Sequence, residues 1–413
     1  MPLLTSLLVL IVAARLFGGL FARLKQPAIV GEIVAGILLG PAVLGLVHST
    51  PPLQGISDLA MFLVVSSAGL EMNSRDVLKA IRGKGLVIAI LGFFIPFLAG
   101  LGLGAAFSLD LMRTIFLGLC ISITALPVAL RIMESFKMLD TDIARYCIVA
   151  AIANDIVALL ILGVILGLPS EGGTLTAIAW AVLVTGGKLV AFGAMVWGAG
   201  ALLAFLDRKG IAVSRILERL VSLFGSDALF GIVIMLVLFF ASVSEMLGFS
   251  FVIGAFFGAL LIDKELFLAS RYSELELTMS SLSKGFLAPL FFASLGLEFS
   301  LTQMPSVQFV TAVLLVSIFT KIFAGWLGGV LTRLSQAEAW GIGFLLNGRG
   351  IMELVIANIA YTHHFIGQGF FSTLVVMGVV TTILAPLLFK KFVYAKLAGT
   401  TVLRPSPSAA AGE

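Results

Sequence analysis

Apolar runs of about 20 residues recur along almost the whole chain, with short polar connections between them. A helix of that length spans the hydrocarbon core of a bilayer. The pattern therefore predicts an all-α polytopic membrane protein with about thirteen spans: Leu3–Phe21, Ala28–Val47, Ile56–Leu70, Gly85–Phe107, Leu111–Met133, Ile143–Leu166, Leu175–Phe205, Leu223–Met246, Phe249–Ile262, Leu282–Leu297, Val307–Leu331, Ala337–Tyr361 and Phe370–Val393.

Composition agrees with a chain that lies almost entirely in the membrane. Of the 413 residues, 60% are hydrophobic and 12% are charged. That is too little polar surface for a soluble protein of this size. The first run lacks the basic segment and cleavage site of a signal peptide, so we expect it to be a helix. Cys120 and Cys147 fall inside expected spans and support neither a disulfide nor a metal site.

Lysine and arginine are concentrated in every second connection and in the tail. The connections around His48, Pro169, Met304 and His363 contain neither residue. Basic connections stay in the cytoplasm, so the pattern predicts the amino terminus outside and the carboxyl terminus inside. We expect a multi-pass protein of a bacterial inner membrane.

Two similar segments predict an internal repeat. SSAGLE (66–71) ends the third expected span, and ASLGLE (293–298) ends the tenth. An odd number of spans separates the two copies, so they run in opposite directions across the membrane. This arrangement predicts inverted repeats of spans 1–6 and 8–13, joined by span 7.

Each repeat also contains a helix breaker in the middle of a span. TALP (124–127) interrupts the fifth expected span, and NGRG (347–350) interrupts the twelfth. Paired broken helices at the membrane midplane expose carbonyl groups and helix ends to an ion in secondary transporters. Two kinked helices that only pack together are the alternative reading.

Asp155 lies near the centre of the sixth expected span. Desolvation disfavours the charged form of a lone carboxylate, so Asp155 can hold a proton near neutral pH and release it to an arriving cation. Asn154 and Thr124 add neutral oxygen atoms, which alkali cations prefer as ligands. The sequence therefore predicts a Na+ or K+ site at Asp155. A purely structural pairing of Asp155 with Lys321 or Arg349 stays open.

Three basic residues, Lys188, Lys321 and Arg349, also lie near mid-span. Each costs on the order of 2.5–3.5 kcal/mol to insert. Lys321 is either a cation that the bound ion displaces or a fixed countercharge. Arg349 and Glu353 lie four residues apart on one helix face, and we expect them to pair. We expect Lys188 to reach the membrane surface or a backbone carbonyl.

Three segments resemble the monovalent cation:proton antiporter-2 family, and within it most resemble the plant cation/H+ exchangers and the fungal K+/H+ antiporters. They are QPAIVGEIVAGILLGP (26–41), SITALPVALRIMESFKMLDTDIARYCIVAAIANDIVALLIL (122–162) and NGRGIMELVIANIA (347–360). The resemblance implies the sodium/proton antiporter fold, with two crossed broken helices, and a homodimer. It also implies that Asp155 binds the ion, that Ala125 and Pro127 belong to the unwound motif, and that Lys321 is the core lysine.

The resemblance further implies a fixed part and a part that moves as an elevator. The expected dimer domain is 1–72 with 223–300, the moving core is 84–168 with 305–395, and the linker helix is 174–206. The tail, 396–413, is expected to be disordered and cytoplasmic because of its composition. We do not expect a nucleotide-regulated gate.

The Asn154–Asp155 pair bears on stoichiometry. Electrogenic relatives carry two adjacent acids here, whereas relatives with Asn-Asp are expected to be electroneutral but usually carry arginine in place of Lys321. We predict one-for-one exchange of Na+ or K+ for H+, with no cofactor and no nucleic-acid partner. No nucleotide loop or nucleophile arrangement indicates an enzyme. A gated cation channel and a sodium-coupled symporter of an organic solute are the alternatives.

Overall fold

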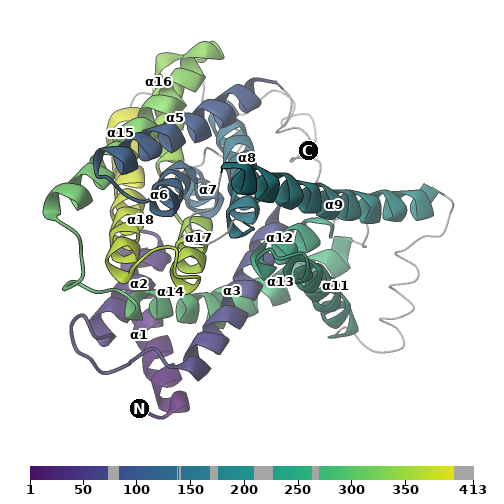
Figure 1. The fold of residues 1–413 in the computed structure, drawn as a ribbon, viewed down its shortest axis with the longest axis horizontal. Coiled ribbons are helices and arrows are strands. Elements are labelled where there is room, and N and C mark those ends of the chain that lie inside the picture. Colours follow the sequence, from purple (N-terminus) through teal and green to yellow (C-terminus); the bar gives the residue numbers. More distant parts are fainter. Residues whose placement is uncertain are drawn as a thin grey trace, which may run out of the picture. The chain divides into compact units, whose positions relative to one another are not determined.

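The computed structural model describes residues 1–72, 83–136, 138, 141–167, 175–208, 227–262 and 269–394. The regular elements within these ranges are all helical (Figure 1). In this part of the chain nine helices are long and apolar enough to cross a membrane, and three shorter helices are also apolar. The expected tail (396–413), the start of the eighth span (223–226) and several basic connections lie outside the described residues.

The helices follow the order and the positions that the hydropathy pattern predicts. They are α1 (Leu3–Arg23), α2 (Ala28–Leu39), α3 (Pro51–Glu71), α5 (Lys84–Ala106), α6 (Leu111–Ser122), α7 (Leu126–Ser135), α8 (Asp142–Leu166), α9 (Leu175–Arg208), α11 (Asp227–Met246), α12 (Phe251–Leu260), α13 (Ala269–Leu282), η2 (Ser283–Leu287), α14 (Ala288–Leu297), α15 (Val307–Leu331), α16 (Gln336–Leu346), α17 (Ile351–Thr362), α18 (Gln368–Phe389) and η3 (Lys390–Tyr394).

Three expected boundaries were wrong by more than a turn. The third span begins at Pro51 rather than Ile56. The second span ends at Leu39 rather than Val47, because Gly40 adopts an extended conformation and Pro41 follows it. The tenth span begins at Ala269 rather than Leu282. Its first segment, ASRYSELELTMSSL, is polar, so hydropathy does not reveal that it is helical.

Both predicted helix breaks are present. The fifth span is divided into α6 and α7, and the twelfth into α16 and α17. In the first break Ile123 is extended, with φ −70° and ψ 149°. Proline has no amide hydrogen, so Pro127 cannot donate to the carbonyl of Ile123 four residues earlier. The chemistry of this one residue therefore favours an interruption at the observed position.

The two repeats contain equivalent close contacts between glycine residues of neighbouring helices. A Cβ atom on Gly100 of α5 would lie 2.5 Å from the Cα atom of Gly118 on α6, and one on Gly325 of α15 would lie 2.6 Å from the Cα atom of Gly343 on α16. The two pairs have the same sequence spacing. Small residues allow such close helix crossings in membranes. The order helix, broken helix, helix therefore occurs twice, in α5–α8 and α15–α18, and α5 packs against α15 (Figure 1).

Contacts divide the chain into two compact units. The first comprises Met1–Gln54, Val77–Ala158 and Phe292–Glu413, and the second comprises Gly55–Asp76 and Leu159–Phe291. Both broken helices belong to the first unit. This grouping reflects packing and not movement, so the expected division into a dimer domain and a moving core stays a prediction.

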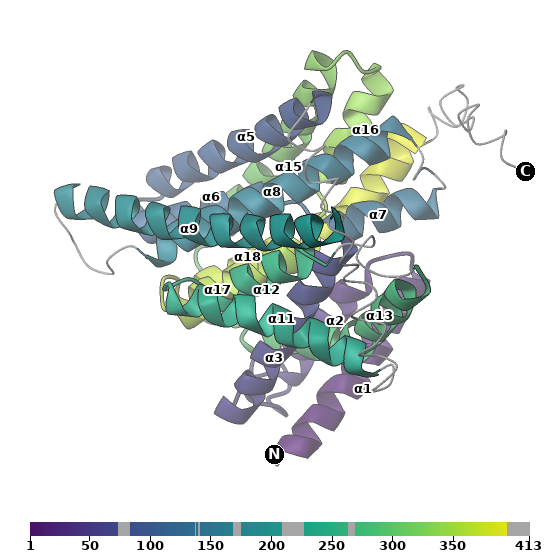
Figure 2. The ribbon, with the colours of Figure 1, turned by 90° about the vertical axis from the view of Figure 1, so that its right-hand side faces the viewer.

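Within the second unit, α11 and α12 lie side by side (Figure 2). Lys188 of α9 donates a hydrogen bond to the carbonyl of Leu247, with Nζ and O 3.1 Å apart. Of the two alternatives expected for Lys188, the membrane surface and a backbone carbonyl, the structure shows the backbone carbonyl.

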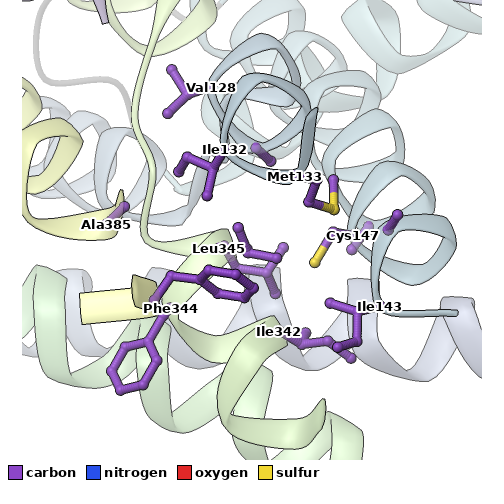
Figure 3. Packing of buried hydrophobic residues seen from close by; sticks show 14 of the residues in the cluster. Val128, Ile132, Met133, Ile143, Cys147, Ile342, Phe344, Leu345 and Ala385 are labelled. Carbon is purple, nitrogen blue, oxygen red and sulfur yellow. The ribbon is translucent and has the colours of Figure 1, made fainter. Parts of the chain in front are cut away.

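An apolar cluster of the first unit includes residues of α7 and α16, one half of each broken helix. Figure 3 shows residues of this cluster from α7, α8, α16 and α18, among them Met133, Cys147 and Leu345. Cys147 and Cys120 are both buried, with free thiols. Close packing of this kind fixes the positions of α7 and α16 relative to each other.

Candidate ion-binding site

The two helix breaks contact each other inside the first unit. The amide of Ala125 donates to the carbonyl of Gly348 at 3.0 Å, and the Thr124 hydroxyl donates to the carbonyl of Leu346 at 3.2 Å. A Cβ atom on Gly350 would lie only 2.6 Å from the Cβ atom of Ala125. Glycine at position 350 therefore permits this approach, and the expected pair of crossed broken helices is confirmed.

The interruption after α6 leaves its last carbonyl groups without helical donors. Arg349 provides donors for three of them. Its Nη1 atom lies 2.7 Å from the Cys120 oxygen and 2.5 Å from the Ile123 oxygen, and its Nη2 atom lies 2.5 Å from the Ile121 oxygen. The guanidinium group therefore caps the carboxyl end of α6, where the helix dipole is negative.

Lys321 completes this cap from α15. Its ammonium group donates to the carbonyl of Ser122, and it also donates to the carbonyl of Gly92 on α5 at 2.8 Å. Four consecutive carbonyls, from Cys120 to Ile123, thus accept hydrogen bonds from two buried cations. The sequence-based expectations for Lys321 did not include this role.

Asp155 lies on α8 with only 3% of its surface exposed. Its Oδ1 atom has no hydrogen-bond partner among the described residues. Lys321 and Arg349 direct their donors to carbonyl groups instead. A buried carboxylate is normally paired or hydrogen-bonded, so an oxygen atom without a donor indicates a place for a proton or a cation.

Asn154, the residue before Asp155, contacts Thr124 of the first break. The Asn154 Nδ2 atom lies 3.3 Å from the Thr124 Oγ1 atom. The opposite amide orientation is better satisfied, because the nitrogen then donates to the carbonyls of Ala89 and Ala150 at 3.1 and 3.2 Å. The Asn154 oxygen then faces the Thr124 hydroxyl. The structure therefore brings these two sequence-predicted neutral ligands together.

Arg349 lies within the second break and Glu353 lies in the first turn of α17, and the two side chains form the expected ion pair. The Arg349 Nε atom is 3.9 Å from the Glu353 Oε2 atom, and both side chains are fully buried. This distance is too long for a hydrogen bond. Pro127 lies in the first turn of α7, beside the first break.

Asn347 was not identified from the sequence as a buried polar group of the second break. It is fully buried at the end of α16, and neither atom of its amide has a hydrogen-bond partner among the described residues. The NGRG motif indicated a helix breaker at this position. An asparagine inside such a breaker was the available signal for a polar group directed into the core.

These features define a class of protein. A membrane-embedded chain with inverted repeats, two crossed broken helices and a buried carboxyl oxygen that has no hydrogen-bond partner in the described part of the chain has the architecture of a secondary ion transporter. The model of the family "Sodium/hydrogen exchanger, transmembrane" matches residues 7–393. The chain belongs to this family.

Individual relatives agree with the family match. The chain is 29% identical to Cation/H(+) antiporter 19 of Arabidopsis thaliana over 92% of its length, and it spans 48% of that protein. It is 27% identical to the probable Na(+)/H(+) antiporter GerT of Bacillus cereus, covering 94% of this chain and 98% of GerT. The chain thus spans about half of the plant relative and nearly all of the bacterial one.

A solved structure confirms the fold. The sodium proton antiporter MjNhaP1 from Methanocaldococcus jannaschii superposes with a TM-score of 0.69 at 18% identity, covering 97% of this chain and all of that one. The sodium/proton antiporter fold that the sequence predicted is therefore correct.

Proposed function

We propose that this chain exchanges Na+ or K+ for H+ across a membrane and that Asp155 binds the cation and the proton in turn. The observation that carries the proposal is the buried Asp155 Oδ1 atom. It has no hydrogen-bond partner among the residues that the structure describes, although Lys321 and Arg349 are also buried in the first unit. The names of the relatives, cation/H+ and Na+/H+ antiporters, support exchange between these ions.

The chemistry follows from competition for one carboxylate. A bound monovalent cation and a bound proton each neutralise Asp155, so only one of them occupies it at a time. Asn154 and Thr124 add neutral oxygen ligands to the cation. Each turnover then moves one positive charge inward and one outward, and the exchange is electroneutral.

The wider arrangement belongs to the same proposal. The chain works as a homodimer in a bacterial inner membrane, with its amino terminus outside and its carboxyl terminus in the cytoplasm. The core, 84–168 with 305–395, moves as an elevator against 1–72 with 223–300, and the linker helix (174–206) joins the two repeats. The charge pattern and the repeated broken helices support this arrangement.

Purified protein in sealed vesicles provides the test. With an acidic interior reported by a pH-sensitive dye, external NaCl or KCl should dissipate the pH gradient, whereas choline chloride should not. Cation flux without proton movement would instead indicate a channel. Cation uptake that requires an organic solute would indicate a symporter, and either result would overturn the proposal.

Stoichiometry is a separate prediction. Clamping the membrane potential at zero, with valinomycin and equal K+ on both sides, should leave the initial rate of Na+-driven proton movement unchanged. An electroneutral exchanger generates no membrane potential, so the clamp does not change its rate. An electrogenic exchanger generates a potential that slows further exchange, so the clamp increases its rate. A severalfold acceleration would contradict one-for-one exchange.

A further inference from the structure

The first unit contains a second buried carboxyl group that the proposed exchange does not use. Glu353 on α17 is 0% exposed, and neither of its carboxyl oxygens has a hydrogen-bond partner among the described residues. Its charged neighbour, Arg349, approaches only to 3.9 Å through Nε, while Nη1 and Nη2 donate to α6 carbonyls. The guanidinium group therefore provides charge but no hydrogen bond.

The helices packed around Glu353 also leave it without a donor. From α18, Gly378 faces the carboxyl group, and a Cβ atom there would lie 3.7 Å from both oxygens. Thr382 of α18 donates to the carbonyl of Arg349. The titratable and charged groups that act on Glu353 are Arg349, Lys321 of α15 and Cys120 of α6. Lys321, like Arg349, is committed to backbone carbonyls.

A carboxylate in such surroundings is poorly stabilised as an anion. Burial without donors penalises the charged form, and a distant guanidinium group offsets this penalty only in part. Adding a proton removes the buried charge, and removing the proton restores the attraction to Arg349. The protonated form and the charged form are therefore each favoured by one feature of the same surroundings.

We propose that Glu353 is a proton-binding site distinct from Asp155, and that it takes up and releases a proton as pH changes without binding a cation. An alkali cation needs several oxygen ligands. The neighbouring carbonyl oxygens at the end of α6 already accept hydrogen bonds from Arg349, whose positive charge also opposes a second cation. A proton needs only the carboxyl group itself.

Infrared difference spectroscopy of the purified full-length chain tests this inference. Spectra recorded at acidic minus alkaline pH in an Asp155→Asn background should contain the carbonyl band of a protonated, buried carboxylic acid. The band should disappear in the double variant with Glu353→Gln and should be unaffected by NaCl or KCl. Glu245→Gln, at an exposed position of α11, is the matched control and should retain the band.

Other outcomes would overturn the inference. A band that survives Glu353→Gln does not belong to Glu353. The absence of any such band means that Glu353 does not take up a proton. A band that Na+ or K+ removes means that a cation binds to the carboxyl group. If Glu353→Gln fails to fold, carbon-13 labelling of glutamate in the single Asp155→Asn variant should shift the band, and an unshifted band would exclude every glutamate. The readout requires no transport, so its failure and that of the proposed exchange are distinguishable.

Discussion

Replacing Asp155 with asparagine will reduce cation/proton exchange to the level of protein-free vesicles. Asparagine has nearly the same shape, but it neither takes up a proton at accessible pH nor neutralises a cation. We expect the rate of exchange to fall at least about a hundredfold, which corresponds to an activation free energy higher by ~3 kcal/mol. The measurement is the initial rate of Na+- or K+-driven pH-gradient collapse, with equal amounts of reconstituted protein.

Asp110→Asn is the matched control for this prediction. Asp110 is exposed at the start of α6, where its side chain accepts a hydrogen bond from the amide of Arg113. Asparagine retains the capping role, so the exchange rate should stay at the wild-type level. An Asp155→Asn protein that exchanges at a rate similar to that of Asp110→Asn would rule out Asp155 as the shared site.

The second large effect concerns stability. Replacing Arg349 with methionine will lower the free energy of unfolding by ~3–5 kcal/mol, as expected when one partner of a buried charged network is removed. Three carbonyl groups of α6 and the carboxyl group of Glu353 lose their cationic neighbour. Thermal unfolding in detergent, followed by intrinsic fluorescence, measures the change.

Two further arginine variants sharpen this measurement. Arg113→Met removes an exposed salt bridge to Asp110, 3.0 Å long, and should cost less than ~1 kcal/mol. Arg349→Lys keeps the charge but loses the planar fork of donors, so its stability should lie between those of wild type and Arg349→Met. An Arg349→Met protein as stable as Arg113→Met would contradict the capping role.

Much of the fold was predictable from the sequence because lipid imposes a simple pattern. The eleventh expected span coincides with α15, Val307–Leu331, at both ends. The hydropathy pattern gave wrong boundaries where helix formation does not depend on apolar residues. The polar residues of α13 form a helix that no apolar run marks, and Gly40 followed by Pro41 ends α2 inside an apolar run.

The contacts around the candidate site were not predictable from the sequence. Sequence position suggested Asp155, Asn154 and Thr124, but it did not show what Lys321 and Arg349 would contact. Those contacts join groups 199 to 229 residues apart. The choice between a carboxylate and a backbone carbonyl depends on distances that only the folded chain defines.

The cap on α6 has a mechanical consequence. The first break is stabilised by Arg349 of the second break, by Lys321 of α15, and by the direct hydrogen bonds of Thr124 and Ala125 to the second break. Bending at either interruption would separate charged donors from their acceptors away from water. The interruptions are therefore rigid joints rather than hinges, and we expect the two crossed helices to move as one body.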